Sequence, residues 1–232
     1  MKILIVSFPL PLPFLRDDLN QHINNFYRGK MSTTITIIRH APTVQNKKGI
    51  FMGTEDIPVD QQEFVSDSFI SLCKNENICL ADCIFTSPLQ RARSTAEAIA
   101  KNEAKRIIID DRLIERHLGD WQGMPKTQVH AKYPDAFINE KMDFFYTPQN
   151  GEPYDVMVKR VADFLVDRCY ENRKLLIVTH NGIFRVMKSL LTGKGLSNVF
   201  QTFEPHLVPE TFFLEDYILD RIRSNPFYTV DK

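Results

Sequence analysis

The alternation of strand and helix signals is the feature that most constrains this chain of 232 residues. Short apolar, β-branched runs fit strands buried on both faces, and the segments between them repeat their apolar residues at helical spacing. The predicted strands are Thr34–Ile38, Cys83–Thr86, Arg106–Ile109 and Leu175–Val178, and the predicted helices are Asp60–Leu72, a helix starting at Ser87-Pro88, Tyr154–Arg168 and Ile183–Leu191. We therefore predict an α/β fold, a three-layer α/β/α sandwich with a largely parallel central sheet. The tail from Thr211 holds one more strand or helix, and the pattern does not decide between them.

Two regions interrupt this alternation. Residues 1–30 run from an apolar stretch into a polar segment before Met31 opens the first strand, so we predict an N-terminal extension at 1–30 and a domain at 31–232. Residues 112–150 are long, aromatic and irregular. Because a loop of this length in a compact domain is usually functional, we predict a cap insertion there. Trp121 in this insertion fits either the core of the cap or a substrate contact.

Charge and hydropathy exclude several classes of partner. Lys+Arg and Asp+Glu number 29 each, and this zero net charge argues against a nucleic acid or an anionic membrane surface. The longest apolar run, Ile3 to Leu15, contains three prolines, so it is too broken to span a bilayer, and it lacks a signal-peptide cleavage site. We expect a cytoplasmic protein whose oligomeric state, a homodimer included, the sequence leaves open.

Charged side chains follow the predicted strands at the points where the strands end. The first strand ends in Arg39-His40, and the second leads into a helix whose first turn carries Arg91. Glu115 follows the third strand, and His180 ends the fourth. Because ligands in open α/β sheets bind beyond the carboxyl ends of the strands, we expect these five side chains to converge at one edge.

Two histidines, two arginines and one carboxylate suit phosphoryl transfer. Guanidinium groups bind phosphate oxygens in a bidentate way, and helix N-termini add free N–H groups. A neutral imidazole can attack phosphorus and hold the phosphoryl group, while a carboxyl group protonates the leaving oxygen. The sequence shows no cluster at metal-ligand spacing, so we expect neither a metal nor another cofactor.

The segment Arg39-His40-Ala-Pro-Thr43-x-x-Asn46 resembles the signature of the histidine phosphatase superfamily, the phosphoglycerate-mutase-like proteins. Four further segments match that family in the same order. They are Phe51-Met-Gly53 with Asp56-Ile-Pro58, Thr86-Ser-Pro-Leu-Gln-Arg91-Ala-Arg-Ser-Thr-Ala96, Leu113-Ile-Glu115 to Gly119-Asp-Trp121-Gln-Gly123, and Val178-Thr-His180-Asn-Gly182. The resemblance covers about residues 34–192 and excludes 1–30. A single Arg-His pair is a weak signal, whereas five motifs in order are a strong one.

The resemblance implies a role for each matching residue. His40 would be the nucleophile that becomes phosphohistidine, and Glu115 would be the proton donor and acceptor. Arg39, Arg91 and His180 would bind the phosphoryl oxygens, and Thr43, Asn46, Gly53 and Asn181 would contribute to substrate binding. Ala41 stands where the family usually has glycine, and its Cβ narrows the conformations open to the backbone.

We predict a metal-independent phosphomonoester hydrolase whose partner is a small phosphorylated substrate. The alternative is a cofactor-dependent phosphoglycerate mutase, because the segment from Glu115 to Lys126 resembles that branch. However, Leu118 replaces its tyrosine, and Met142-Asp143 stands where its cap carries two arginines. We expect Asp143 to repel a second anion and interpret Lys126 as a solvated lysine. A second alternative is a non-catalytic phosphate-binding protein on the same fold, although the expected loss of a catalytic residue is absent.

Overall fold

A five-stranded sheet forms the centre of the fold, in the order β3-β2-β6-β1-β7. The structure, a computed structural model, describes residues 33–101, 105–169, 173–200 and 202–224, so the predicted extension 1–30 lies outside the described residues. The strands are β1 (Thr33–Arg39), β2 (Cys83–Thr86), β3 (Arg106–Ile109), β6 (Lys174–Thr179) and β7 (Glu210–Leu214). The first four run parallel, and β7 pairs antiparallel with β1. The predicted α/β class and largely parallel sheet are confirmed.

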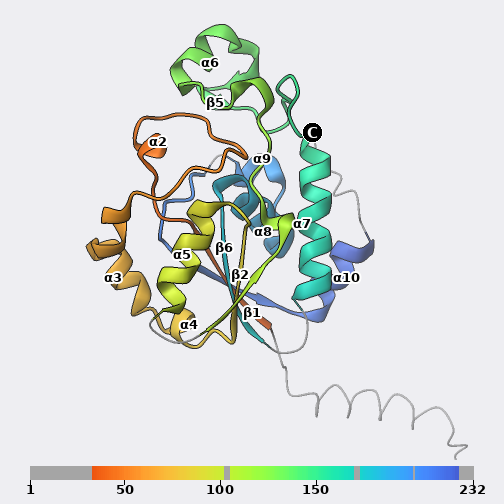
Figure 1. Cartoon of the computed structure of the whole chain (residues 1–232). Helices are drawn as coiled ribbons and strands as arrows, with labels where there is room; N and C mark the ends of the chain where they lie inside the picture. Colours follow the sequence, from red (N-terminus) through yellow and green to blue (C-terminus); the bar gives the residue numbers. More distant parts are fainter. Residues whose placement is uncertain (1–32, 102–104, 170–172, 201, 225–232) are drawn as a thin grey trace, which may run out of the picture. The chain divides into compact units, whose positions relative to one another are not determined.

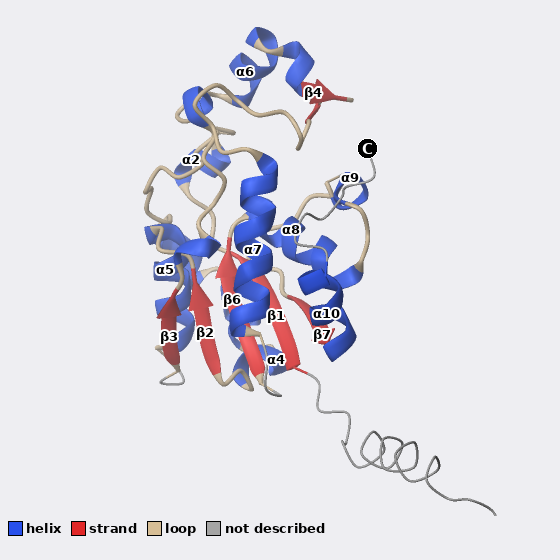
Figure 2. Ribbon diagram, turned by 90° about the vertical axis from the view of Figure 1, so that its right-hand side faces the viewer, coloured by secondary structure: helices blue, strands red, loops and turns tan. Residues whose placement is uncertain are grey.

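Apolar residues alternate along the central strands, so each face of the sheet packs against its own layer of helices. On β6, Leu175 and Ile177 belong to one core, and Leu176 and Val178 belong to the other. The first core is covered by α7 (Tyr154–Arg168), α8 (Asn181–Thr192), α9 (Leu196–Val199) and α10 (Asp216–Ser224), and the second by α3 (Asp67–Cys73), α4 (Glu76–Cys79) and α5 (Gln90–Ala100). Figures 1 and 2 show the resulting three layers.

The tail that the sequence left undecided forms both kinds of element. Strand β7 adds to the sheet with Phe212 opposite Ile35 of β1. Helix α10 then buries Ile218, Leu219 and Ile222 in the first core. The antiparallel strand therefore closes one edge of the sheet, and the helix extends the layer that already covers it.

The predicted single helix over Asp60–Leu72 is wrong. Asp60 caps a 3₁₀ helix, η1 (Gln61–Val65), by accepting a hydrogen bond from the Gln62 amide at 3.2 Å. Ser66 then has extended backbone, and its hydroxyl accepts from the Phe69 amide at 3.2 Å to start α3. Because serine side chains bond to nearby backbone amides, Ser66 ends one helix and starts the next.

The helix predicted to start at Ser87-Pro88 begins later, at Gln90. Ser87 does not cap it, because the residue before the helix is Leu89 in extended backbone. The Ser87 hydroxyl instead lies 2.7 Å from Nε2 of His180 and 3.3 Å from the Leu89 amide. The Ser87 hydroxyl is therefore engaged by His180 at the end of β6, and α5 begins three residues later, at Gln90.

The insertion at 112–150 folds as a cap made of short elements. They are η2 (Asp111–Leu113), η3 (Gly119–Trp121), α6 (Lys126–Lys132), η4 (Pro134–Ala136), β4 (Phe137–Ile138) and β5 (Lys141–Met142). The cap lies beyond the carboxyl ends of the parallel strands, on the same side as α2 (Val44–Lys47) (Figures 1 and 2). Trp121 is 1% exposed and stacks on Tyr146 with ring centroids 5.4 Å apart, so it belongs to the core of the cap.

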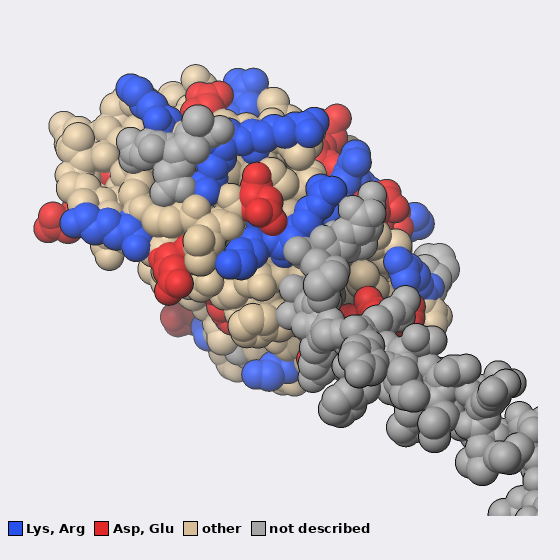
Figure 3. All heavy atoms as spheres, turned by 90° about the horizontal axis from the view of Figure 1, so that it is seen from below, with Lys and Arg blue, Asp and Glu red and all other residues tan. Residues whose placement is uncertain are grey.

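The face seen from below in Figure 3 lies away from the cap. Basic and acidic side chains lie next to one another on it, as the balanced composition leads one to expect. In the part of the chain that the structure describes, no helix is long and apolar enough to cross a membrane.

Two glycines with positive φ, one in the cap and one outside it, allow a test of how tightly the cap is packed. Gly119 has φ 53°, and a Cβ there would lie 1.9 Å from the Gln149 carbonyl oxygen, whereas Gly49 has φ 67° with nothing within 4 Å. We expect Gly49→Ala to lower the free energy of unfolding by about 1 kcal/mol through backbone conformation alone. Gly119→Ala should lower it by about 3 kcal/mol or more, because Gln149 must also move. Equilibrium unfolding in urea measures both, and equal losses would show that the crowding is relieved without cost.

Candidate active site

His40 follows directly on strand β1 and is almost fully buried, with 2% of its surface exposed. Its Nδ1 lies 2.7 Å from the Ala41 carbonyl oxygen. Because a carbonyl only accepts hydrogen bonds, Nδ1 carries the proton and Nε2 keeps its lone pair. Burial, and then the charges of Arg91 and Arg39, hold the pKa of His40 well below its usual value. The ring is therefore neutral near pH 7, in the form that a nucleophile requires.

Ala41 fits its place after the histidine. The residue is fully buried, and its amide donates to Oγ1 of Thr95 at 3.0 Å. Its φ is not positive, so the Cβ adds no backbone strain. The departure from the family's usual glycine is therefore compatible with an intact loop.

Arg91 lies in the first turn of α5 and is held by three protein contacts. Its Nη1 donates to the Glu55 carbonyl and its Nη2 to the Gly53 carbonyl, both at 2.6 Å, and its Nε donates to Nδ1 of His180 at 3.3 Å. Each terminal nitrogen has a second N–H that these contacts leave available. Burial lowers the pKa of Arg91 to about 10, so the group stays charged at neutral pH.

Arg39, the last residue of β1, is the second buried guanidinium. Its Nη1 donates to the Glu204 carbonyl at 2.9 Å, and its plane lies 5.1 Å from the centre of the Phe203 ring. Its Nε is buried without a hydrogen-bond partner in the structure. Burial lowers its pKa to about 10. Arg39 and Arg91 thus carry two positive charges beside His40.

His180 ends β6 and precedes α8, and its ring lies edge-on to His40 with centroids 5.1 Å apart. Because Arg91 can only donate, Nδ1 of His180 accepts its hydrogen bond, and Nε2–H then donates to the Ser87 hydroxyl at 2.7 Å. Both ring nitrogens of His180 therefore bond to protein groups here. Its role in binding phosphoryl oxygens stays a prediction.

Glu115 follows η2 and receives two backbone amides. Oε1 accepts from the Arg116 amide at 2.9 Å, and Oε2 accepts from the Gly182 amide at 3.1 Å. A Cβ on Gly182 would lie 2.6 Å from Oε1, so only glycine allows this approach. The glycine two residues after His180 therefore positions the carboxyl group of a segment far away in sequence.

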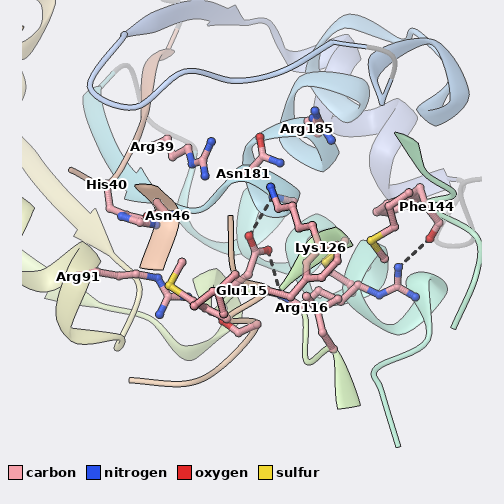
Figure 4. Close-up of a pocket in the computed structure, with 18 of the residues that line it drawn as sticks. Arg39, His40, Asn46, Arg91, Glu115, Arg116, Lys126, Phe144, Asn181 and Arg185 are labelled. Carbon is pink, nitrogen blue, oxygen red and sulfur yellow. Dashed lines mark hydrogen bonds between the residues drawn. The ribbon is translucent and has the colours of Figure 1, made fainter. Parts of the chain in front are cut away.

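One cavity of about 150 Å³ collects most of the predicted site (Figure 4). Arg39, His40, Arg91 and Glu115 line it, whereas His180 is not among the lining residues and packs edge-on against the His40 ring. Asn46, Gly53 and Asn181, predicted to contribute to substrate binding, also line it. Apolar side chains of the cap and its surroundings complete the wall, among them Phe51, Met142 and Phe144.

Thr43 does not line this pocket, in contrast to the other three residues predicted for substrate binding. Its hydroxyl accepts from the Asn46 amide at 3.1 Å, and its own amide donates to Oδ1 of Asn46 at 3.1 Å. This reciprocal pair caps α2. Thr43 therefore orients Asn46, whose side-chain oxygen is occupied and whose NH₂ group remains for an anion.

Three cations that line the pocket were not predicted for it, namely Arg116, Lys126 and Arg185. Lys126 is exposed, in agreement with its interpretation as solvated, and it also lines the pocket with its ammonium group 5.7 Å from the centre of the Phe51 ring. Arg185 lines it from α8. Helical spacing provides a signal for Arg185, because it lies four residues after Asn181 on the same helix face.

His206 is a further residue that sequence reasoning missed. Its Nδ1 donates to the His40 carbonyl oxygen at 2.6 Å, and its ring is edge-on to His40 with centroids 5.1 Å apart. A bridge between Arg39 and His206 holds the two segments together. The sequence carries no motif at this position, so only the folded chain reveals the contact.

Positive charge dominates the site. Among the residues that the structure describes, no group of three or more His, Cys, Asp or Glu side chains is placed to hold a metal ion. Of the described residues that line the pocket, five are cations, Arg39, Arg91, Arg116, Lys126 and Arg185, and one is a carboxylate, Glu115. Such a set suits a dianionic phosphoryl group.

The imidazole of His206 makes stability depend on pH. Burial and Arg39 lower its pKa from 6.5 to about 4. The unfolded chain takes up this proton as the pH falls below 6.5 and the folded protein does not, so stability present above pH 6.5 is lost as the pH falls. We expect wild-type protein to lose about 1–2 kcal/mol of unfolding free energy between pH 7 and pH 5 relative to His206→Asn, which keeps a donor for His40.

Urea unfolding at the two pH values measures this difference. His130→Asn is the matched control, because His130 lies on the exposed surface of the cap. Parallel pH dependence in wild type and His206→Asn would show that His206 titrates alike in the folded and unfolded chain.

Comparison with known proteins places these residues within one family. The model of the histidine phosphatase superfamily (branch 1) matches residues 35–206, a span that contains all the site residues described above. The putative phosphoserine phosphatase 2 of Hydrogenobacter thermophilus is 30% identical over 168 residues, which are 71% of this chain and 81% of that protein. A 2,3-bisphosphoglycerate-dependent phosphoglycerate mutase of Bifidobacterium longum is 35% identical over 131 residues, which are 54% of this chain and 52% of the mutase.

Solved structures agree on the fold. The mycobacterial glucosyl-3-phosphoglycerate phosphatase in complex with VO3 aligns with a TM-score of 0.67 at 21% identity. The alignment covers 79% of this chain and 97% of that chain.

Proposed function

Because the chain belongs to the histidine phosphatase superfamily (branch 1) and is a phosphatase, we propose that it hydrolyses small phosphomonoesters through a phosphohistidine on His40. The observation that carries this proposal is the hydrogen bond from Nδ1 of His40 to the Ala41 carbonyl. Because this bond fixes the proton on Nδ1, the lone pair on Nε2 is available for attack. The imidazole that carries it is neutral and buried, and it lies beside two guanidinium groups. A non-catalytic binding protein has no need of such a nucleophile.

The reaction has two steps on this geometry. Nε2 of His40 attacks phosphorus, and the bond from phosphorus to the ester oxygen breaks as Glu115 protonates that oxygen. Glu115 then takes a proton from water, and the hydroxide attacks phosphorus and breaks the N–P bond. Inorganic phosphate leaves, and His40 is neutral again. Arg39 and Arg91 stabilise the charge on the phosphoryl oxygens in both transition states.

The substrate is a small cytoplasmic metabolite in this proposal. A cavity of about 150 Å³ beneath an aromatic cap supports a small molecule. Relatives whose names mention phosphoserine and glucosyl-3-phosphoglycerate support the same class. The match to a phosphoglycerate mutase, together with Lys126 and Arg185 in the pocket, keeps the mutase as a second candidate.

The nucleophile is tested by trapping the intermediate. Quenching in base during turnover of a ³²P-labelled ester should yield a base-stable, acid-labile phosphoprotein, and His40→Ala should yield none. We also expect turnover to survive EDTA, because the proposed steps use only side chains. Near wild-type turnover by His40→Ala, or loss with EDTA and rescue by Mg²⁺, would contradict the mechanism.

The acid is tested by varying the leaving group. Glu115→Gln should slow hydrolysis of an alkyl phosphate by about 10²–10⁴-fold, because the alkoxide needs a proton as it leaves. An activated aryl phosphate should be slowed much less, since its leaving group is stable without protonation. Steady-state kcat on glycerol 3-phosphate and on p-nitrophenyl phosphate gives the two factors. Equal slowing of both would assign Glu115 a structural or binding role instead.

A further inference from the structure

The backbone around Glu115 has no regular secondary structure to hold it. Residues 114–118 lie between η2 and η3 and belong to no helix or strand. The carboxyl group is nevertheless oriented, because its two oxygens accept from the Arg116 and Gly182 amides. Backbone groups without a partner inside a helix or strand need partners elsewhere, so other parts of the chain must keep this segment in place.

One ion pair joins α7 to the residues just before it. Nε and Nη2 of Arg160 donate to Oε1 and Oε2 of Glu152 at 2.7 and 3.0 Å, the two-pronged contact that suits a guanidinium and a carboxylate. The side chains are 17% and 15% exposed. Charges shielded in this way depend on each other, because removal of either one leaves the other without compensation.

The pair holds the segment of Glu115 on both sides. Before Glu115, Nη1 of Arg160 donates to the Arg112 carbonyl at 2.6 Å, and Nη2 contacts the Glu115 carbonyl itself at 3.5 Å. After Glu115, Oε2 of Glu152 accepts from the His117 amide at 3.4 Å, and the Glu152 amide donates to the His117 carbonyl at 2.8 Å. One ion pair is therefore bound to the backbone on either side of the predicted acid.

The contact between Arg160 and Glu115 acts on the peptide group that orients the carboxyl group. The Glu115 carbonyl belongs to the same peptide group as the Arg116 amide, which donates to Oε1 of Glu115. Because a peptide group is planar, its carbonyl and its N–H turn together. A partner that holds the carbonyl therefore keeps the N–H directed at the carboxylate.

Packing of α7 keeps Arg160 in place outside the pocket. Met157 and Phe164, three residues before and four residues after Arg160, are fully buried in the first core. Neither Arg160 nor Glu152 is among the described residues that line the pocket, whereas Glu115 is. An effect of the pair on the reaction must therefore pass through another residue.

We propose that the Glu152–Arg160 ion pair positions the carboxyl group of Glu115 for proton transfer to the leaving oxygen. This inference rests on the proposed function, in which Glu115 is the acid. Both members of the pair are positioning residues, because their contacts with this segment go to its backbone. Glu152 also balances the charge of Arg160, which then donates to carbonyls and leaves the Glu115 carboxylate to the two amides.

The leaving group distinguishes positioning of the acid from a general loss of folded protein. We expect Arg160→Gln to lower kcat/KM for glycerol 3-phosphate by about 10–100-fold, because a small displacement of a reacting group is that costly. For p-nitrophenyl phosphate, whose leaving group needs no proton, the loss should be about 3-fold or less. The ratio of the two values is the measurement, since a smaller folded fraction lowers both alike.

Two further variants and one control assign the effect to this pair. Glu152→Gln keeps the shape of the side chain without its charge and should change the ratio in the same direction. Arg160→Lys keeps the charge without the two-pronged contact, so a smaller change is expected. Lys159→Met should keep the wild-type ratio, because Lys159 forms an exposed ion pair with Asp163 on the same helix. A wild-type ratio in both Arg160→Gln and Glu152→Gln, or an equal change in Lys159→Met, would overturn the proposal.

A double variant separates this inference from the proposed function. In a Glu115→Gln background, Arg160→Gln should cause no further loss on glycerol 3-phosphate, since the group that it positions is already removed. A full additional loss would overturn the positioning role and leave Glu115 as the acid. Equal slowing of both esters by Glu115→Gln alone would contradict the acid, and the absence of a further loss from Arg160→Gln would still support the pair.

Carbon-13 NMR reports on Glu115 without turnover. In protein labelled at the glutamate carboxyl carbons, the side-chain signal that is missing from Glu115→Gln identifies Glu115. Its chemical shift should change in Arg160→Gln and in Glu152→Gln and stay constant in Lys159→Met. If no ester is turned over, hydrolysis fails, and this comparison decides the positioning role: a changed shift supports it, and an unchanged shift in both pair variants contradicts it.

Discussion

The hydrogen bond from Nδ1 of His40 to the Ala41 carbonyl is the interaction on which the rest of the site depends. It decides which ring nitrogen holds the lone pair, and it can persist only if the backbone after β1 keeps its course. The Thr95 hydroxyl, on α5, accepts a hydrogen bond from the Ala41 amide. His206, in the segment before β7, donates a hydrogen bond to the His40 carbonyl. The orientation of one imidazole is therefore maintained by a helix and by a loop segment that are both far from it in sequence.

A second constraint is the accumulation of positive charge in a buried place. Arg39 and Arg91 sit next to His40, and carbonyl oxygens, not carboxylates, orient them. Carbonyl partners fix a guanidinium without cancelling its charge, so the field at the phosphoryl position is kept. Burial, and then the positive charge of the arginines, lowers the pKa of His40 and of His180 and keeps both rings neutral. The one carboxylate at the centre, Glu115, is held by backbone amides and not by an arginine.

The cap contributes apolar side chains and a lysine to the pocket wall, in addition to the residues at the strand ends. Trp121 and its aromatic neighbours form a small core of their own, so the cap is packed around buried side chains and is not an irregular surface loop. From the cap Lys126 reaches the pocket. Arg116 donates to the Phe144 and Tyr146 carbonyls within the cap and to the Glu152 carbonyl just before α7. The strand ends and the cap, which both line the pocket, are thus packed around separate cores.

The four predicted strands, their largely parallel arrangement and the convergence of Arg39, His40, Arg91 and Glu115 at one edge of the sheet follow from the sequence alone, whereas the order of the strands in the sheet does not. Local periodicity identifies buried strands, and the geometry of a parallel sheet brings their carboxyl ends together. The helix Tyr154–Arg168 was predicted with its observed bounds for the same reason, since its apolar stripe is strong and continuous.

Tertiary structure decided the remaining features of the site. These features depend on contacts between segments that are distant in sequence, and local sequence patterns do not encode such contacts. Ser87 bonds to His180 and so does not cap α5, and Thr43 turns to Asn46 and away from the pocket. His206 carries no motif for its position, and only packing of the segment before β7 brings it to the site. Lys126 ends a segment that resembles the mutase branch, but only packing of the cap places it beside the pocket. Lys126 stays exposed to solvent and also lines the pocket, because a long lysine side chain can lie along an apolar wall while its ammonium group remains in water.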